Sequence, residues 1–467
     1  MKVITRFPPS PTGNLHIGSV RTALFNYLFA RHHGGKIHLR FENTDEERSK
    51  REYEQNILDS LSWLGLTFDP ICDKQYWRQS ERKEIYRTYL KKLVDTGKAY
   101  ISKESATTLE SSSPDPLPHR LSVSRRARER GAEGKRRDEV IRFKNPNKKI
   151  SFEDLIRGHI EFDTTELGDM VIAKSLEEPL YHLAVVIDDS EMDITHVLRG
   201  EDHISNTPRQ ILLQEALGLA RPAYAHIPLI LAPDRSKLSK RHGAVSVTEY
   251  RDRGYLKEAL LNYLALLGWN PGSDREIFSL AELVQVFDLS KVQKGGAIFN
   301  EEKLRWINKE YLRRVDPKEF VRHIPESLLA GKTDIQRESI SEMLFDRVSV
   351  YGDMQTGLDS GEFEYLSRDP TYEKELLRWK KSGESPTLHL EAVRSLLENL
   401  PAASFRKSRL KEVIFPYAEE KGKGNVLWPM RVALSGRAES PDPFALAAML
   451  GKEVTLRRLS HALNSLR

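Results

Sequence analysis

The fold is decided by the stretch Pro9-Ser10-Pro11-Thr12-Gly13-Asn14-Leu15-His16-Ile17-Gly18-Ser19. Its prolines fix φ and Gly13 permits a turn, which predicts a rigid loop that opens a helix. Residues 3–7 before it predict a short strand, and Gly34-Gly35 predicts the end of the helix. His16 and Gly18 therefore fall at a strand-loop-helix corner, where backbone N–H groups and the helix dipole favour a phosphate.

A second stretch, Lys237-Leu238-Ser239-Lys240-Arg241, lies more than two hundred positions later. Polar residues flank it, which predicts an exposed loop that can bring two ammonium groups to a triphosphate. Each stretch alone is weak evidence, because a His-x-Gly at a helix start is usually a cap and a basic pentapeptide is usually solvated surface. Together and in this order they predict an ATP site.

Composition limits the class of protein. A chain of 467 residues is long enough for about two to four domains, and its net charge of +5 is mild. A strongly basic run from Arg120 to Lys149 is either a solvated helix face or a surface for a phosphate backbone. Cys72 is the only cysteine, so neither a disulfide nor a cysteine zinc site is expected, and the chain begins with no signal peptide and contains no membrane-length apolar run. We expect a cytoplasmic protein.

Strand and helix patterns alternate in the first hundred residues. The sequence predicts a strand at Lys36–Glu42, a helix from Asp45 to Leu64 and a helix that Ser80 caps and Gly97 ends. This alternation predicts a parallel, doubly wound sheet. An insertion follows from about residue 100, with antiparallel strands in residues 140–163. The apolar run Tyr181–Ile187 predicts a buried strand, Thr207-Pro208 opens a helix, and the chain is almost entirely helical beyond Ser246.

The two stretches resemble the HIGH and KMSKS elements of class I aminoacyl-tRNA synthetases. Further motifs are similar in order and spacing to bacterial glutamyl-tRNA synthetases as far as about residue 315: Arg6-Phe7-Pro8-Pro9-Ser10-Pro11-Thr12-Gly13, Phe41-Glu42-Asn43-Thr44-Asp45, Arg78-Gln79-Ser80-Glu81-Arg82, Tyr181-His182-Leu183-Ala184, Arg199-Gly200-Glu201-Asp202-His203 and Lys303-Leu304-Arg305-Trp306-Ile307-Asn308. The remainder is similar more loosely, chiefly through residues 429–436.

The resemblance implies an α/β protein. It has a class I Rossmann-type catalytic domain with an α+β insertion, followed by an all-helical anticodon-binding region. The expected boundaries are 1–99 and 181–245 for the two halves of the catalytic domain, 100–180 for an acceptor-stem-binding insertion, 246–315 for a helical stem-contact domain, and 316–467 for an anticodon-binding region of two subdomains.

The resemblance also implies an activity. Glutamate attacks the α-phosphate of ATP to give glutamyl-adenylate, and the acyl group then passes to the 3′ end of tRNA(Glu). The implied partners are L-glutamate, ATP with Mg²⁺ and tRNA(Glu), with no zinc, no membrane and a monomeric chain.

The family motifs assign candidate residues on this sequence. The catalytic residues are His16, Lys237 and Lys240; the ATP-binding residues are Ser10, His16, Gly18, Glu201, Lys237 and Lys240; the glutamate-binding residues are Arg6, Pro8, Ser10, Glu42, Tyr181 and Arg199; and the anticodon-binding residues are Arg347 and Arg431. No metal ligand is assigned. A guanidinium at position 347 has donors and no acceptor, which suits cytosine better than guanine and predicts discrimination against tRNA(Gln).

Two positions depart from the family pattern. Val185 stands where the family commonly has asparagine, and Pro8 stands where it usually has alanine. The alternatives are a non-discriminating enzyme that also glutamylates tRNA(Gln), a glutaminyl enzyme or a short tRNA-modifying paralogue, a nucleotidyltransferase acting on small substrates, and a non-catalytic RNA-binding protein.

Overall fold

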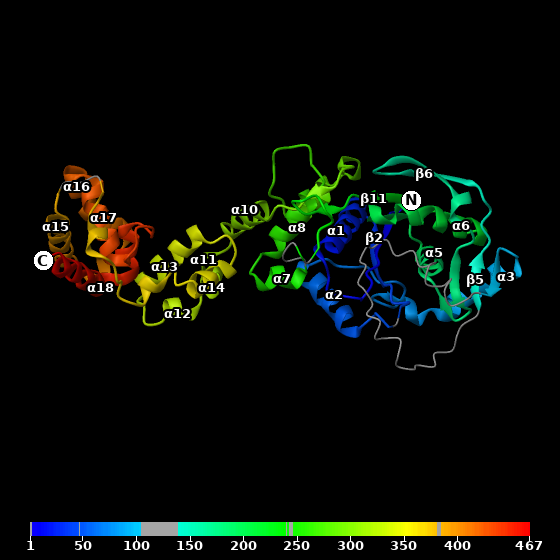
Figure 1. Ribbon diagram of the computed structural model, residues 1–467, viewed down its shortest axis with the longest axis horizontal. Coiled ribbons are helices and arrows are strands. Elements are labelled where there is room, and N and C mark those ends of the chain that lie inside the picture. Colours follow the sequence, from blue (N-terminus) through cyan, green and yellow to red (C-terminus); the bar gives the residue numbers. More distant parts are fainter. Residues whose placement is uncertain (1, 46, 104–138, 240, 242–245, 381–383) are drawn as a thin grey trace, which may run out of the picture. The chain divides into compact units, whose positions relative to one another are not determined.

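The computed structural model describes residues 2–45, 47–103, 139–239, 241, 246–380 and 384–467 (Figure 1). The chain forms two compact units, Met1–Arg251 with Lys257–Ile307 (unit 1), and Asp252–Leu256 with Asn308–Arg467 (unit 2). Lys240 and residues 120–138 of the basic run lie outside the described residues. In the described part of the chain, no helix is long and apolar enough to cross a membrane.

Unit 1 is built on parallel strands. These are β1 (Ile4–Phe7), β2 (Lys36–Phe41), β3 (Trp77–Arg78), β10 (His196–Gly200) and β11 (Ala223–Ile227). β2 pairs in parallel with β1 and β3, and β10 pairs in parallel with β11. The Thr195 N–H donates to the Ile4 carbonyl at 3.0 Å and brings β10 alongside β1. The strand order is therefore β3-β2-β1-β10-β11, which reverses direction between β1 and β10.

Helices cover both faces of this sheet. The Thr5 hydroxyl donates to the Asn26 carbonyl of α1 (Ile17–His32), whereas the neighbouring Arg6 binds Asp189 of α5 (Tyr181–Glu191). Successive residues of a strand point to opposite faces, so α1 and α5 lie on opposite sides. The α/β, doubly wound class predicted from the sequence is confirmed. In such sheets ligands bind beyond the carboxyl ends of the strands where the order reverses.

The remaining helices of unit 1 follow the same chain order. They are α2 (Arg51–Leu64), α3 (Lys83–Asp95), α6 (Thr207–Leu217), α7 (Val247–Asp252), α8 (Lys257–Leu266), α9 (Leu280–Val286) and α10 (Glu301–Leu312), the last of which continues into unit 2. A short parallel pair joins β12 (Ile230–Leu231) to β13 (Ala297–Ile298).

The insertion contains antiparallel strands, as predicted. One sheet has the order β4 (Ala99–Lys103), β5 (Glu139–Phe143), β8 (Val171–Ser175), β9 (Glu178–Pro179). β6 (Lys149–Asp154) and β7 (Gly158–Asp163) form an antiparallel hairpin, and β6 also pairs in parallel with β11 at Asp154 and Tyr224. The insertion is thus joined to the catalytic sheet through β6.

The prediction of a strand at Tyr181–Ile187 is wrong, because this run forms helix α5. Residues 182–189 are all buried, so the helix has little polar face. A short apolar run without alternation fits a buried helix as well as a buried strand.

Two predicted helix starts are also wrong. α2 begins at Arg51 rather than at Asp45, and α3 begins at Lys83 rather than after a Ser80 cap. Ser80 instead lies in a single 3₁₀ turn, η1 (Gln79–Glu81), where its N–H donates to the Asn43 side chain at 2.9 Å. A distant acceptor thus replaces the local cap. α6 does begin at Thr207 with a proline in its first turn, as predicted.

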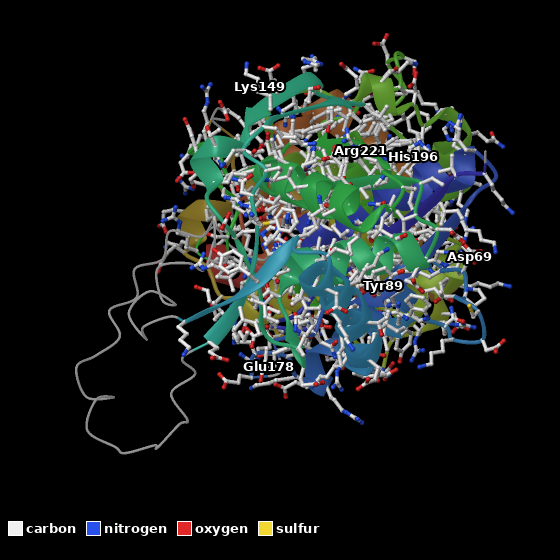
Figure 2. The ribbon with its side chains drawn as sticks, turned by 90° about the vertical axis from the view of Figure 1, so that its right-hand side faces the viewer. Asp69, Tyr89, Lys149, Glu178, His196 and Arg221 are labelled. Atoms are coloured by element: carbon white, nitrogen blue, oxygen red, sulfur yellow. The ribbon has the colours of Figure 1, made fainter. Side chains whose placement is uncertain are left out.

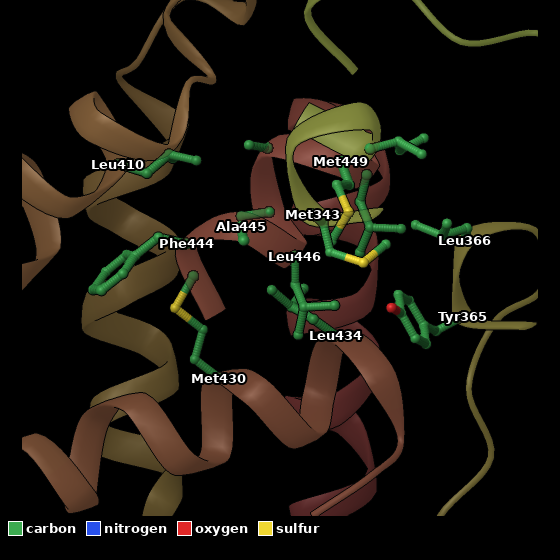
Figure 3. Packing of buried hydrophobic residues seen from close by; sticks show 14 of the residues in the cluster. Met343, Tyr365, Leu366, Leu410, Met430, Leu434, Phe444, Ala445, Leu446 and Met449 are labelled. Atoms are coloured by element: carbon green, nitrogen blue, oxygen red, sulfur yellow. The ribbon is translucent and has the colours of Figure 1, made fainter. Parts of the chain in front are cut away.

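Unit 2 is helical, and no strand occurs in its described residues. Its helices are α11 (Pro317–Arg322), α12 (Glu326–Leu329), α13 (Asp334–Arg347), α14 (Gly352–Asp359), α15 (Pro386–Glu398), α16 (Lys407–Lys421), α17 (Lys423–Ser435) and α18 (Pro443–Leu466). Figure 3 shows part of their shared core, in which Met430 and Leu434 of α17 pack near Phe444 and Leu446 of α18. The predicted helical C-terminal region is confirmed.

Candidate active site

A cavity of about 1280 Å³ opens in unit 1 beyond the carboxyl ends of β1, β2 and β10. Most of the predicted catalytic-unit residues line it: Pro8, Ser10, His16, Gly18, Glu42, Tyr181, Arg199 and Lys237. Arg6 and Glu201 are the two described candidates that do not line it. The strand ends therefore bring together residues that are far apart in sequence.

His16 caps the helix that begins the nucleotide corner. Its backbone is extended, and its Nδ1 accepts the N–H of Gly18 at 3.0 Å. A neutral imidazole that accepts at Nδ1 carries its proton on Nε2, which makes Nε2 a donor. A Cβ at position 18 would lie 3.2 Å from His16 Nδ1, so glycine permits this tight cap. A donor at the positive end of a helix is suited to a phosphate.

Lys237 lies across the cavity from this corner in sequence, but the fold brings the two segments together. Ser246, just beyond the Lys237 loop, forms an isolated β-bridge with His16. The Lys237 ammonium is half-exposed and pairs with Asp202 at 3.1 Å. Leu238 donates to the Ile230 carbonyl and anchors the base of the loop. A cation held on one carboxylate at the rim of the cavity can move to a phosphate.

Glu42, Ser10 and Tyr181 form the wall opposite the loop. The Ser10 hydroxyl donates to the Glu42 carbonyl at 3.0 Å, and the Glu42 N–H donates to Pro9. Burial raises the pKa of Glu42, although the Arg40 guanidinium at 3.0 Å opposes that shift. Burial also raises the pKa of Tyr181 to about 12, so its hydroxyl stays protonated.

The two predicted carboxylate-binding arginines differ in their partners. Arg6 is buried and ion-paired with Asp189 at 3.1 Å, and Asp189 also pairs with Arg40 at 2.7 Å. One terminal nitrogen of Arg6, Nη1, is buried without a hydrogen bond. Arg199 is equally buried, yet no ion pair joins it to a carboxylate of the described residues. Its positive charge is therefore available to an anion in the cavity.

Glu201, predicted to bind ATP, directs its carboxylate to protein groups. One oxygen pairs with Arg157, and the other accepts the Leu229 N–H at 2.7 Å. These contacts connect the insertion with the segment that leads to β12. The carboxylate thus orders the backbone beside the cavity.

The two departures from the family pattern lie in different places. Pro8 lines the cavity with a backbone that has no N–H to donate. Val185 lies on α5, is 1 % exposed, and is not among the cavity-lining residues that the structure describes. An asparagine at position 185 would therefore have to bury its amide.

Sequence reasoning missed several polar residues at the cavity. His203 accepts from or donates to the Tyr181 hydroxyl at 3.3 Å, and Asp202 holds Lys237. Burial lowers the pKa of His203 to about 4 and that of His182 to about 3, so both imidazoles are neutral near pH 7. Asp202 and His203 are part of the quoted Arg199–His203 motif, which was the available signal. The buried His226, discussed below, had no sequence signal.

The described end of the basic run is already paired with acids. Lys148 pairs with Glu215 at 2.5 Å, and Lys149 pairs with Glu161 at 2.9 Å. Figure 2 shows Lys149 on the outer surface of the unit, and its side chain is well exposed. Exposed pairs of this kind contribute little stability and can exchange one partner for another.

The predicted anticodon residues lie in unit 2. Arg347 is the last residue of α13, and its half-exposed guanidinium pairs with Glu362. Arg431 is half-buried on α17, and its Nε lacks a hydrogen-bond partner. The arginine that the described contacts bring to the Glu362 segment is Arg437, which donates to the Gly361 carbonyl at 2.7 Å.

Comparison with known proteins covers both units. Residues 2–306 match the family of class I tRNA synthetase (E and Q) catalytic domains, and residues 280–463 match an anticodon-binding domain family. A glutamate–tRNA ligase of Aquifex aeolicus is 44% identical over 100% of this chain and 99% of its own length. One of Heliobacterium modesticaldum is 42% identical over 98% and 96% of the two chains.

A solved structure agrees with these relatives. The crystal structure of a glutamate tRNA ligase from Elizabethkingia meningosepticum in complex with its amino acid matches with a TM-score of 0.83 and 33% identity, and it covers 100% of both chains. The motifs, the cavity and the full-length similarity agree: the chain belongs to the glutamate–tRNA ligase family of class I tRNA synthetases.

Proposed function

We propose that the cavity of unit 1 activates L-glutamate with ATP and transfers it to tRNA(Glu), with the residue roles set out below. The observation that carries these roles is the charge of Arg199. It is a buried guanidinium at the cavity, and its partners among the described residues are uncharged. A buried cation of this kind favours a carboxylate, which a guanidinium binds through two parallel hydrogen bonds.

The first step needs positioning rather than an enzyme nucleophile. A carboxylate oxygen of glutamate attacks the α-phosphorus of ATP, the bond to the β-phosphate oxygen breaks, and pyrophosphate leaves with the electron pair. Negative charge increases on the leaving group. The His16 Nε2–H, the start of α1 and the Lys237 ammonium are the groups of this chain that can stabilise that charge. We place Lys240 of the same loop in this role on its sequence motif.

The second step transfers the acyl group. A hydroxyl of the terminal tRNA ribose attacks the acyl carbon, the mixed-anhydride bond breaks, and AMP leaves as its phosphate anion. Tyr181, with its hydroxyl protonated, and Glu42 line the part of the cavity in which we place the amino acid. We place ATP there as its magnesium complex, because Mg²⁺ in such sites is held mainly by phosphate oxygens and water and needs no cluster of protein ligands.

We also propose that the chain discriminates against tRNA(Gln) through Arg347, with Arg431 as a second anticodon contact. The alternative is a non-discriminating enzyme. A cytoplasmic monomer completes the proposal, and the lone exposed Cys72 fits a reducing compartment.

The amino-acid assignment is tested by aminoacylation kinetics with glutamate and glutamine. We expect charging with glutamate alone. Arg199→Gln should raise the glutamate KM by about 10- to 100-fold, the worth of one charge-assisted contact, and change the ATP KM little. Arg221→Gln is the matched control, because Arg221 is an exposed arginine paired with Glu215. Equal use of glutamine, or an unchanged glutamate KM in Arg199→Gln, would contradict the assignment.

The role of Lys237 is tested at the activation step. Lys237→Ala should lower the single-turnover rate of adenylate formation by about 10²- to 10³-fold with little change in glutamate affinity, because a cation aimed at developing charge acts in the transition state. Lys36→Ala, at the exposed start of β2, is the control. A rate within about twofold of the parent would remove Lys237 from this role.

A further inference from the structure

The guanidinium of Arg199 is held by three neutral acceptors. Nε donates to His226 Nε2 at 3.2 Å, Nη1 to Gln210 Oε1 at 2.8 Å and Nη2 to Thr207 Oγ1 at 2.7 Å. A guanidinium has five N–H donors. Two therefore remain without a partner in the described residues, one on each terminal nitrogen. That pair has the fork geometry that matches a carboxylate.

The His226 contact requires one particular tautomer. His226 Nδ1 lies 2.6 Å from Asp154 Oδ2, and both side chains are fully buried. An ionised carboxylate can only accept, so Nδ1 carries the proton. Nε2 then has a free lone pair, which is what the Arg199 Nε–H needs. Burial lowers the pKa of His226, which keeps the ring neutral despite the neighbouring acid.

Asp154 is itself fixed by the backbone. It is the last residue of β6, and its Oδ1 accepts the N–H groups of Ile156 at 3.0 Å and Arg157 at 2.8 Å. Its Oδ2 also accepts the His226 N–H at 3.1 Å. Burial favours the neutral acid, but the bonds from His226 and from the backbone outweigh it and lower the pKa of Asp154. The carboxylate is therefore ionised and cannot rotate away.

We propose that Asp154 and His226 are positioning residues for Arg199: Asp154 fixes the tautomer of His226, and His226 holds the guanidinium so that its two remaining N–H groups face the substrate carboxylate. The inference rests on the proposed function, in which Arg199 binds glutamate. It gives a β-strand of the insertion a part in amino-acid binding, because Asp154 belongs to β6 and Arg199 to β10.

Asp154→Asn tests the tautomer. If the asparagine oxygen keeps the two backbone N–H groups of the turn, its amide nitrogen faces His226 Nδ1 and donates to it. The proton of the ring then moves to Nε2, where two donors, His226 Nε2–H and Arg199 Nε–H, face each other. We expect the glutamate KM to rise about 10- to 100-fold while the ATP KM stays within about twofold.

A pair of substitutions at position 226 divides the two contacts. In His226→Asn the amide can donate to Asp154 as Nδ1 does, but no atom reaches Arg199. In His226→Gln the longer side chain places an oxygen near the position of Nε2 and can accept from Arg199. We expect His226→Asn to raise the glutamate KM about 10- to 100-fold and His226→Gln to recover most of that loss.

Tyr224→Phe is the matched structural control. Tyr224 is buried on the same strand two residues away, and its hydroxyl bonds Gln214 at 3.0 Å. Phenylalanine removes this buried bond but keeps the ring that lies 5.6 Å from the Arg199 guanidinium. We expect no change in the glutamate KM. An increase that equals that of His226→Asn, or a parallel increase in the ATP KM in the relay variants, would show a general loss of structure and overturn the proposal.

Two measurements separate this proposal from the proposed function. Asp154→Asn should add little to the glutamate KM in an Arg199→Gln background, because both changes act through the same contact. If Arg199→Gln raises the KM and the relay variants do not, the positioning role fails alone. If Arg199→Gln has no effect, the glutamate-site assignment fails first. Should the relay variants not fold, ¹⁵N spectra of histidine-labelled parent enzyme decide: a proton on His226 Nδ1 supports the proposal, and one on Nε2 overturns it.

Discussion

His182 shows what burial of a titratable group implies for stability. It is 7 % exposed, and burial lowers its pKa from 6.5 to about 3. The unfolded chain therefore binds a proton between pH 6.5 and about 3 that the folded chain does not. Stability from the neutral ring is fully present above pH 6.5 and is lost as the pH falls toward 3.

His182→Gln should remove this part of the acid sensitivity. Relative to the parent, the variant should lose about 1.5 kcal/mol less unfolding free energy for unit 1 between pH 6.5 and pH 5, by linkage from the two pKa values. Urea unfolding at the two pH values measures the difference, and other histidines cancel because they occur in both proteins. Equal losses in parent and variant would show that His182 is not buried neutral.

Individual residues were predictable where a motif is local. The loop at residues 8–18 and the Lys237 loop are short segments, and their described candidates line the cavity. Partners from distant segments were not predictable. Arg6 meets Asp189 and Glu201 meets Leu229, and nothing in either local sequence shows whether an arginine has an acid beside it. This is why Arg6 and Arg199 were given one role, although only Arg199 lacks a carboxylate partner in the described chain.

Among the elements, α18 contains a break that another helix supports. Gly451 has φ 77° and ψ 171° inside α18, which frees the carbonyls before it. Gln336 of α13 donates to the Met449 and Leu450 carbonyls at 3.2 and 2.7 Å. The same side chain accepts the Thr333 N–H and completes a capping box at the start of α13.

Gln336→Glu separates the two tasks of this side chain. Glutamate can still accept from Thr333, but it has no N–H for the two carbonyls. We expect a loss of about 1 to 3 kcal/mol in unit 2, the cost of leaving buried acceptors unpaired. Thr333→Ala, which removes the cap alone, should cost about 1 kcal/mol. Denaturant unfolding measures both, and a Gln336→Glu cost no larger than that of Thr333→Ala would contradict the support of the break.

Helix and strand predictions succeeded where periodicity or a local terminator decides the structure. α1, β2 and the end of α2 at Gly65, with φ 74°, belong to this group. The errors share a cause, which is tertiary structure acting on a short segment. α5 is buried on nearly every side, so its sequence lost the polar face that identifies a helix, and Ser80 took a bond from Asn43 instead of capping α3.

The insertion gives a prediction about salt. Arg125, Arg126 and Arg128, which lie outside the described residues, should contact tRNA phosphates. Neutralising all three should reduce the slope of log affinity against log salt by about one unit per lost contact. Lys148→Ala with Lys149→Ala is the control, because Glu215 and Glu161 already neutralise these lysines. Filter binding to tRNA at several salt concentrations measures the slope. An unaltered slope in the triple variant would make the run an ordinary solvated surface.

For the whole molecule, the sequence predicted the order of its parts better than their number. The structure divides into two compact units, and the change falls at Ile307–Asn308, inside α10. A boundary within a continuous helix has none of the glycine, proline or polar composition by which a linker is recognised. The five-segment division remains a prediction, which limited proteolysis can test.

The choice between two tRNAs is a property of the whole chain, because chemistry in unit 1 reports recognition in unit 2. Arg347 ends α13 with its guanidinium on Glu362, in a half-exposed position that a base can reach. Its donors complement the O2 and N3 acceptors of cytosine and oppose the N–H donors of guanine, so we expect kcat/KM to favour tRNA(Glu) by about 1 to 3 kcal/mol.

Arg347→Gln should narrow that ratio, since the glutamine amide can both donate and accept. Arg368→Gln is the matched control, because Arg368 is an exposed arginine of the same unit that pairs with Glu364 at 2.7 Å, and it should leave the ratio unchanged. Transcripts of both tRNAs, charged by the parent and the two variants, give the three ratios. Since Arg347 also stabilises the Glu362 contact, the melting temperature of each variant is compared so that a loss of fold is not taken for a loss of recognition. Equal charging of both tRNAs by the parent would identify a non-discriminating enzyme, and an unchanged ratio in Arg347→Gln would move the choice to another residue of unit 2.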